Sequence, residues 1–438
     1  MVNLDPSLLG ILSFIIFIAL IIIGLPIGIS MALMGFLGIW AMKGSTVALN
    51  ALFQLPFSAI SSWLLSVIPM FILMGYIAFY AGFTRDAYDT AYKWVGRFPG
   101  GLAVATLIGA ALFGACSGSS VAATAALGKV ALPEMERHNY DRRLAAGTVA
   151  MGGTLDALIP PSILLVLYGV ITEESIAKLL IAGILPGILS MACFILLVIF
   201  RVIFRPELAP RGEKFTWKER FISLKGAVGI GIIFVAIIGG LYTGIFTPTE
   251  AGAVGASSCL ILSLGMRRMD WMNFQKVVYD SLKVFSSIFL IILGAYIFVR
   301  FLALTRLPVA FSEFVVALPV HRMWIYLGII VVYLILGCFM DALGLLFLTV
   351  PFIFPAVMAL GFDPIWFGII VVKMLEIGLI TPPVGIQAYV LKGVAPPEIT
   401  LGDIFRGFVP FFLVDLFGVI GLLTLFPQIV TILPSMMK

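Results

Sequence analysis

The sequence predicts an all-α polytopic membrane protein built from an inverted repeat. Two observations lead to this fold class. The first is composition, because 62% of the 438 residues are hydrophobic and only 11% are charged, whereas about one quarter of the residues in soluble domains are charged. The second is a fixed spacing that relates the two halves of the chain. A duplicated, membrane-embedded chain accounts for both observations.

The repeat is visible as one offset that holds along the whole chain. Adding 222 to a residue number carries Pro26 to Pro248, Cys116 to Cys338, Pro133 to Pro355, Pro160 to Pro382 and Pro161 to Pro383. Because the chain has only four cysteines, a match between two of them in this register is not expected by chance. Internal duplication of this length is typical of many membrane folds. We expect a first repeat at 1–203, a linker at 204–223 and a second repeat at 224–438.

Five apolar segments in each half are long enough to cross a bilayer, which takes about 17–25 residues. The expected crossings are 5–24, 25–42, 58–82, 143–172 and 178–203 in the first half, and 224–241, 247–265, 284–304, 364–395 and 406–434 in the second. Two copies with an odd number of crossings insert in opposite orientations, so the repeat is predicted to be inverted. The first apolar run lacks a basic leader and a cleavage site, which indicates a retained span and not a signal peptide.

Two further apolar stretches are interrupted in the middle by polar residues. Segments 98–133 and 323–360 each have two apolar arms, with tips at residues 117–120 and at Asp341. We interpret both as re-entrant hairpins that enter the membrane from opposite faces. The 222-residue offset places Asp341 opposite Ser119.

The crossings at 143–172 and 364–395 are predicted to be broken helices. Paired prolines interrupt them at 158–162 and 380–385. Proline removes an N–H donor and frees a carbonyl one turn earlier, and an unsatisfied backbone group in lipid costs several kcal/mol. Kinked spans packed with small residues are the alternative, but the recurrence of the pair favours a binding site.

The distribution of basic residues predicts the orientation. Loops assigned to one side hold 20 of the 27 Lys and Arg residues, and the positive-inside rule makes that side cytoplasmic. Both termini are then periplasmic, and the stretch 201–225, which contains seven basic residues, is a cytoplasmic linker. The net charge of +5 therefore reflects loops at a membrane face and does not indicate nucleic-acid binding.

The polar tips and the helix breaks together offer hard oxygen ligands. A carboxylate within a span costs about 2.5 to 3.5 kcal/mol on insertion scales and needs a compensating partner. No Lys or Arg in the arms of the second hairpin supplies one for Asp341, but a bound alkali cation would. We expect two Na⁺ sites with an anion between them. The first would use Ser117, Ser119 and carbonyls between Gly153 and Pro160, including Leu158, and the second Gly337, Asp341 and Thr381.

Several motifs resemble one family over essentially the full chain. They are GACSGSSVAATAALG at 114–128, LIPPSILLVLYG at 158–169, AGILPG at 182–187, FTPTEAGAVGA at 246–256 and ITPPVGIQAYV at 380–390. These segments are similar to the large membrane subunit of tripartite ATP-independent periplasmic (TRAP) transporters. Gln387 departs from that pattern, since similar proteins often carry a shorter amide or an apolar residue there.

The resemblance implies a bacterial inner-membrane importer of organic acid anions, commonly C4-dicarboxylates or sialic acid, driven by Na⁺. It implies two partners, a smaller four-helix membrane subunit and a periplasmic substrate-binding protein. It also implies a scaffold around a transport domain that moves as an elevator. Carried onto this chain, the family's substrate positions fall on Ser119, Ser120, Pro161, Ser162, Thr381, Pro383 and Gly385.

Four charged residues within the spans have several interpretations. Lys373 and Glu376 are three residues apart on one helix, and this spacing favours an internal ion pair. Asp156 lies four residues before Pro160, so it could face the site, cap a helix or pair with a nearby span. Asp415 in the last span is expected to make a subunit or interhelical contact.

Two other functions remain as alternatives. A membrane-embedded enzyme is disfavoured because residues 114–118 do not form GxSxG and neither histidine falls in a span. A stand-alone Na⁺/dicarboxylate symporter with a similar two-hairpin architecture is the second alternative, and uptake without a binding protein would support it. The sequence lacks a GxxxxGK[ST] loop, so no ATP hydrolysis is expected.

Overall fold

The computed structural model describes residues 5–210 and 212–437, apart from the side chains of residues 115–117. Throughout this part of the chain the regular structure is helical, with no strand. Six helical stretches are long and apolar enough to span a membrane, namely Trp63–Tyr80, Ile176–Phe204, Trp217–Tyr242, Trp271–Thr305, Ala342–Ala359 and Leu401–Leu425. The protein is therefore an all-α polytopic membrane protein, as predicted.

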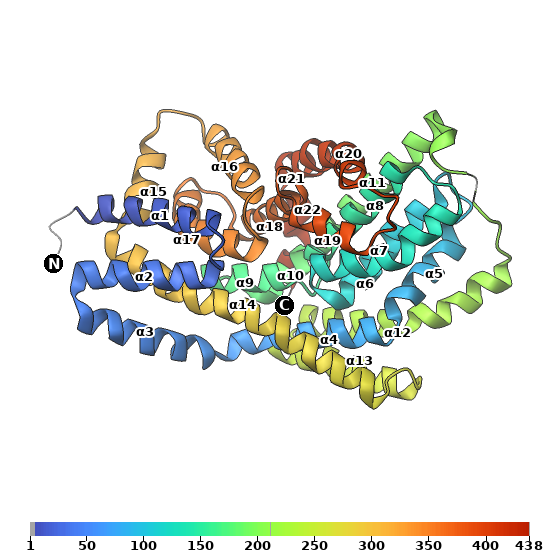
Figure 1. The fold of residues 1–438 in the computed structure, drawn as a ribbon, viewed down its shortest axis with the longest axis horizontal. Coiled ribbons are helices and arrows are strands. Elements are labelled where there is room, and N and C mark those ends of the chain that lie inside the picture. Colours follow the sequence, from blue (N-terminus) through green and yellow to red (C-terminus); the bar gives the residue numbers. More distant parts are fainter. Residues whose placement is uncertain (1–4, 211, 438) are drawn as a thin grey trace.

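One group of helices includes the long helix α14, which runs through the lower part of Figure 1, several helices that pack on it directly, and α12 and α13, which join the group through α4. The group comprises α1 (Pro6–Ile22), α2 (Ile27–Lys43), α3 (Ser45–Ile60), α4 (Val67–Tyr80), α12 (Trp217–Tyr242), α13 (Pro248–Gly265), α14 (Trp271–Thr305) and α15 (Leu307–Ala317). Helix α14 packs against α2 and α4, and α13 packs against α4 and α12. Helices α3 and α15 were not predicted as separate elements, and α14 begins well before residue 284.

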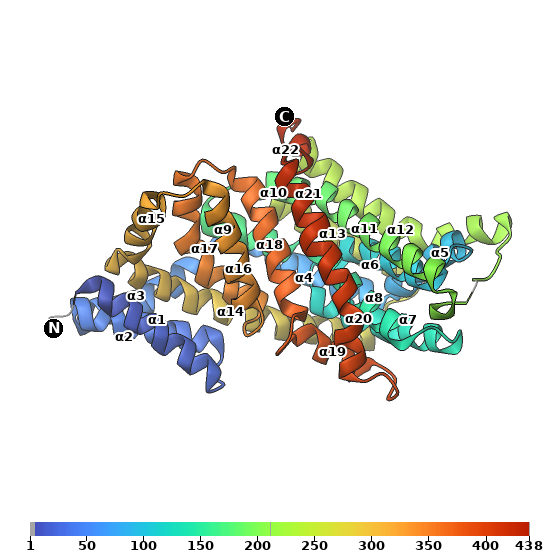
Figure 2. The same ribbon diagram turned by 90° about the horizontal axis from the view of Figure 1, so that it is seen from above.

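The remaining helices contain the predicted hairpins and broken helices. They are α5 (Phe83–Val95), α6 (Gly101–Ser117), α7 (Ser120–Arg137), α8 (Arg142–Thr154), α9 (Ile163–Thr172), α10 (Ile176–Ala182), α11 (Ile184–Phe204), α16 (Arg322–Gly337), α17 (Ala342–Ala359), α18 (Pro364–Ile380), α19 (Ile386–Val394), α20 (Leu401–Leu413), α21 (Ile420–Leu425) and α22 (Gln428–Ser435). Figure 2 shows α16, α17 and α18 side by side, with α20 and α21 next to α18. Helices α6 and α7 form one pair joined at a short tip, and α16 and α17 form the other.

The two halves of the chain interlock at the helix breaks. The second part of each broken helix packs against the hairpin of the other half, so that α19 contacts α7 and α9 contacts α17. The bounds of α7 and α17 differ by the 222 residues of the sequence offset. The division into two repeats and their opposite orientation in the membrane stay predictions.

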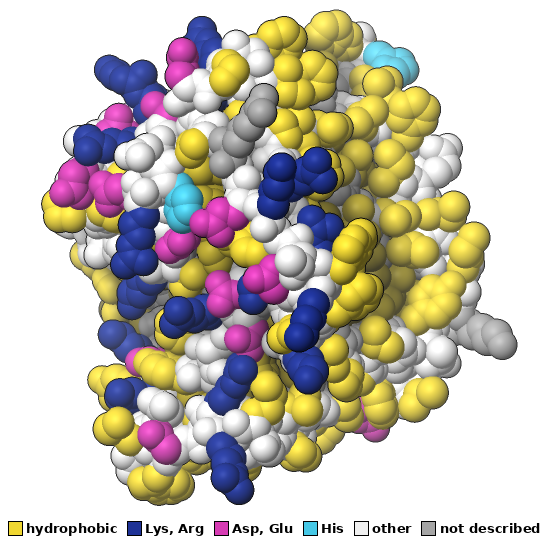
Figure 3. Space-filling model, turned by 90° about the vertical axis from the view of Figure 1, so that its right-hand side faces the viewer, with side chains coloured by type: hydrophobic (Ala, Val, Ile, Leu, Met, Phe, Trp, Pro, Cys, Tyr) yellow, Lys and Arg dark blue, Asp and Glu magenta, His cyan; other side chains and the backbone are white. Residues whose placement is uncertain are grey.

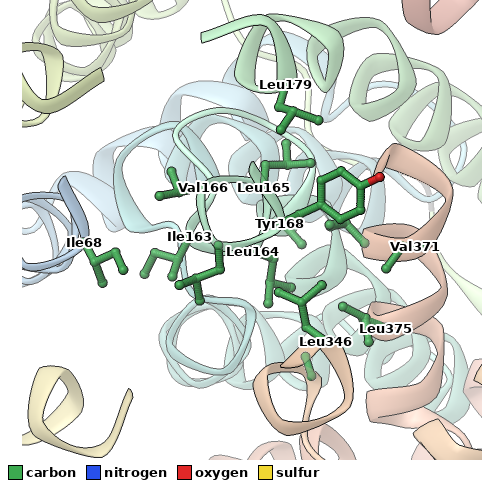
Figure 4. Close-up of a cluster of buried hydrophobic side chains, with 14 of the residues drawn as sticks. Ile68, Ile163, Leu164, Leu165, Val166, Tyr168, Leu179, Leu346, Val371 and Leu375 are labelled. Carbon is green, nitrogen blue, oxygen red and sulfur yellow. The ribbon is translucent and has the colours of Figure 1, made fainter. Parts of the chain in front are cut away.

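Helix α9 lies at the centre of the apolar core. Figure 4 shows its side chains surrounded by those of α4, α10, α17 and α18. The labelled cluster comprises Ile68, Ile163, Leu164, Leu165, Val166, Tyr168, Leu179, Leu346, Val371 and Leu375, all of which are buried. Every residue from Ile163 to Gly169 is buried within the protein, so the first helix break, which comes directly before them, lies deep inside the protein and not at its lipid-facing surface.

Charged side chains gather at one end of the molecule. Figure 3 views the right-hand end of Figure 1, where α5, α7 and the start of α12 lie, and it shows Lys, Arg, Asp and Glu side chains over one part of that face. The other part is covered mainly by apolar side chains. A boundary of this kind is expected where a protein passes from water into lipid.

Candidate functional site

At each hairpin tip a polar side chain caps the helix that follows. Gly118, with a φ of +64°, makes the turn between α6 and α7, and a left-handed φ of this kind favours glycine. Ser119 then caps α7 by accepting a hydrogen bond from the Ala122 amide over 3.5 Å. At the second tip, Asp341 caps α17, because its Oδ2 accepts from the amides of Leu343 at 3.1 Å and Gly344 at 3.2 Å.

Asp341 therefore has a source of charge compensation within its own helix. Helix N-termini stabilise a carboxylate through exposed amides and the aligned peptide dipoles. From the sequence alone, a basic residue or a bound cation is the expected partner of this carboxylate, and the amides of its own helix are not. The same carboxylate also lines a cavity.

This cavity has a volume of about 140 Å³ and lies between the two tips. Elements from both halves of the chain contribute to its wall. Its lining includes Gly118, Ser119, Ser120, Val121, Ala157, Ile163, Leu164, Val284, Ile288, Asp341, Ala342, Leu343, Glu376, Leu379 and Ile386. The structure therefore brings together the two hairpin tips and both helix breaks, which are remote from one another in the sequence.

The first break, at residues 158–162, is buried along its whole length. The Pro161 carbonyl faces the first tip, since a Cβ atom added to Gly118 would lie 3.0 Å from that oxygen. The Leu158 carbonyl instead faces Gly183, at the start of α11. These two predicted site residues thus present their carbonyls to different neighbours.

Ser162 and Gly153 lie on either side of this break. The Ser162 hydroxyl caps α9 by accepting from the Leu165 amide over 3.3 Å. Gly153 is buried and packs closely against the side chains of Thr124 and Gln387. Ser162 therefore stabilises the start of α9, whereas Gly153 allows the end of α8 to pack closely against the first hairpin.

The second break, at residues 381–385, is more open than the first. The Thr381 hydroxyl is half-buried and donates to the Ile377 carbonyl over 2.6 Å. Pro383 is exposed and does not line the cavity, whereas Gly385 is buried with a φ of +59°. None of the three predicted residues in this segment, Thr381, Pro383 and Gly385, is among the residues that line the cavity, whereas their neighbours Leu379 and Ile386 are.

Gly337 lies where the second hairpin meets α18. A Cβ atom added to it would lie 2.7 Å from the Cα of Gly378, so only glycine allows this close approach of two helices. Pro160 is buried in the first break. The Ser117 side chain lies outside the described residues, so the structure does not place this predicted ligand.

Three polar residues that sequence reasoning did not assign to the site lie at the tips. Asp156 is fully buried, and its Oδ1 accepts from the Gly118 amide over 3.2 Å. Glu376 lines the cavity. Gln387 is fully buried, and its Nε2 donates to the Ser120 carbonyl at 3.3 Å and to the Thr124 hydroxyl at 2.5 Å. Their position inside apolar spans was the available signal, because such residues mark functional sites in membrane proteins.

The predicted ion pair between Lys373 and Glu376 is wrong. The Nζ atom of Lys373 lies 2.9 Å from Oδ1 of Asp415, and both side chains are fully buried. Asp415 belongs to the π-helical segment Val414–Val419, between α20 and α21. It therefore makes the interhelical contact that was expected of it, with a partner that the sequence did not identify.

Comparison with known proteins gives concordant matches. Residues 14–429 match the family model described as the DctM component of the tripartite ATP-independent periplasmic transporter. The C4-dicarboxylate TRAP transporter large permease protein DctM of Pseudomonas aeruginosa is 36% identical over 381 residues, which cover 86% of this chain and 88% of that protein. The sialic acid TRAP transporter large permease protein SiaM of Vibrio cholerae is 32% identical, with 96% and 97% covered.

A solved structure shows the same fold. The YdaH transporter of Alcanivorax borkumensis superimposes with a TM-score of 0.59 at 15% sequence identity, with coverage of 97% of this chain and 98% of that one. At this level of identity the match concerns the fold alone.

Proposed function

Because this chain belongs to the DctM component family of tripartite ATP-independent periplasmic transporters, we propose that it is the large membrane subunit of a Na⁺-driven importer of organic acid anions. The cavity between the two hairpin tips carries this proposal. Hydroxyl groups, a capped carboxylate and helix ends converge there in the interior of an apolar protein. A C4-dicarboxylate or sialic acid is the proposed cargo, by analogy with the relatives that are named for these anions.

The residues at the tips have the chemistry that Na⁺ requires. Carboxylate, hydroxyl and carbonyl oxygens are hard ligands, and Asp341, Ser119 and the Pro161 carbonyl lie at or beside the cavity wall. A cation in front of Asp341 would neutralise its charge and allow an anion to approach. Cation binding would thereby organise the anion site, which is the proposed basis of coupling.

A second cavity connects the first tip to a basic residue. It has a volume of about 160 Å³, shares Ser119 and Val284 with the first cavity, and is also lined by Lys129. Lys129 lies on the side that the positive-inside rule makes cytoplasmic. The positive charge would favour movement of an anion from the tips toward the cytoplasm.

The assembly and the motion are proposed by analogy with the family. A smaller membrane subunit and a periplasmic substrate-binding protein would complete the importer in the bacterial inner membrane, with both termini of this chain in the periplasm. The hairpins and broken helices would move together as an elevator relative to the helices around α14. No ATP hydrolysis by this chain is expected.

Uptake into vesicles tests the proposal. The chain is reconstituted with its small subunit and its binding protein, which gene neighbourhood identifies, and uptake of labelled succinate and of sialic acid is measured with and without an inward Na⁺ gradient. Uptake of one of these anions that needs both the gradient and the binding protein is expected. Equal uptake without Na⁺ would overturn the coupling, and uptake by this chain alone would favour a stand-alone symporter.

A further inference from the structure

Glu376 is a carboxyl group that faces the transport cavity without a basic partner. It lies on α18, one turn before the second break, and its side chain is 1% exposed. It lines the same cavity as Asp341 and Ser120. Its Oε2 atom has no hydrogen-bond partner among the described residues. A buried, unpartnered oxygen beside a cavity is what a site for a small cation or a proton presents.

The charged groups around Glu376 do not neutralise it. Lys373, one turn earlier on α18, is held by Asp415 at 2.9 Å, and its ammonium group also lies over the Phe194 ring. The other titratable groups that face Glu376 are Asp156 and, across the cavity, Asp341, and both are acidic. Ionised Glu376 would thus add negative charge to an already acidic site.

The uncharged neighbours of Glu376 can form hydrogen bonds with a protonated carboxyl group as well as with an ionised one. The Ser120 side chain makes a hydrogen bond with Glu376, and a hydroxyl group can donate to a carboxylate or accept from a carboxylic acid. Gln387 holds the Ser120 backbone by donating to its carbonyl over 3.3 Å. The geometry around Glu376 therefore does not depend on its being charged.

The ionised and the protonated forms of Glu376 differ in their free energy inside the protein. An isolated ionised carboxylate in a low-dielectric interior costs so much solvation free energy that the group normally neutralises instead. An organic anion that entered the cavity would repel an ionised Glu376 further. We infer that Glu376 is a proton-binding site of the transport cavity, protonated while the anion is bound and ionised when the cavity opens to water without it. The proton comes from and returns to water, and the inference rests on the proposed transport function.

Infrared spectroscopy of the purified full-length chain tests the site without transport. A protonated carboxyl group has a distinct carbonyl stretch, which should disappear as the pH is raised through its titration. The Glu376→Gln variant should lack this component, and the Glu398→Gln variant, which changes an exposed carboxyl, should keep it. An unchanged spectrum in Glu376→Gln would overturn the inference.

Uptake measurements test the link to the anion. With the full complex, the wild-type KM for succinate or sialic acid should rise with pH, by up to about tenfold per pH unit for one linked proton. Glu376→Gln should make KM independent of pH, and Glu376→Asp should keep a pH dependence with a shifted midpoint. If Glu376→Gln does not fold, the shifted midpoint in Glu376→Asp decides the question.

Two results would overturn the inference. One is a wild-type pH slope retained in Glu376→Gln. The other is a Glu376→Gln variant in which the Na⁺ concentration for half-maximal uptake changes while the dependence of KM on pH stays that of the wild type. That result would make Glu376 a Na⁺ ligand. Failure of the proposed function is distinguishable, because the wild-type complex would then take up neither anion while the infrared component still titrated.

Discussion

The side chain of Gln387 joins the second broken helix to the first hairpin, with its Nε2 donating to the Thr124 hydroxyl over 2.5 Å. The same nitrogen donates to the Ser120 carbonyl, next to the first tip. Gln387 is fully buried. One amide therefore fixes the position of α19 relative to α7, across the two halves of the chain.

Replacing this amide should destabilise the protein. Gln387→Leu keeps a similar volume but removes the donor from two buried acceptors, and the expected loss is about 1–3 kcal/mol. Thermal unfolding of the purified chain in detergent measures it. Gln428→Leu is the matched control, because Gln428 is exposed on α22. Equal unfolding midpoints in the two variants would contradict the role assigned to Gln387.

The ion pair between Lys373 and Asp415 supports a second prediction. Lys373→Met would leave a buried carboxylate without its partner, and breaking a buried pair in this way costs about 3–5 kcal/mol. The double variant Lys373→Met/Asp415→Leu removes both charges and should be more stable than Lys373→Met. Unfolding midpoints of the two single variants and the double variant give the coupling. A double variant less stable than either single variant would show that the pair is not the relevant interaction.

The partner of Lys373 could not be predicted from the sequence. Helical spacing places Glu376 within reach of Lys373, but the actual partner follows 42 residues later, in another helix. Which helix lies beside α18 is a property of the packed protein. Local spacing carries no information about it.

The helix boundaries also include some that local sequence predicts and others that it does not. The tips and breaks were predictable because Gly, Ser and Pro interrupt apolar runs there. Helix α3 was missed because polar residues and Pro56 lower its hydropathy, and α5 because its charged face hides the apolar face on which Phe83, Ala87 and Ala91 are buried. The asymmetry between a buried first break and an exposed Pro383 could not be predicted either, since the offset relates the two sequences and not their surroundings.

Asp341 has a helix-capping role that can be separated from its charge. Asparagine caps helices about as well as aspartate, so Asp341→Asn should keep the fold of the second tip while removing the proposed Na⁺ ligand charge. A tenfold or larger rise in the Na⁺ concentration for half-maximal uptake is expected, which corresponds to a loss of about 1.4 kcal/mol or more. Na⁺ titration of uptake in vesicles measures this change.

Asp363→Asn is the control for that experiment. Asp363 caps α18 through a 2.7 Å hydrogen bond from the Trp366 amide and does not line the cavity. Its replacement should leave Na⁺ activation unchanged. If Asp341→Asn also leaves Na⁺ activation unchanged, Asp341 is a structural cap and the cation site lies elsewhere.

Crosslinking tests the proposed elevator motion. Ala122 on α7 and Val284 on α14 line one cavity although they belong to the two helix groups that would slide past each other. Cysteines at these positions, in a background without the four native cysteines, should abolish uptake when a thiol crosslinker joins them, and a cleavable crosslinker should allow reductant to restore it. A control pair at Trp63 and Thr249, whose side chains lie 3.0 Å apart between Nε1 and Oγ1, joins elements that stay together and should not block uptake. Full uptake with the α7 and α14 pair completely crosslinked would require a static pathway, because a covalent link between the two groups leaves no room for the sliding that an elevator needs.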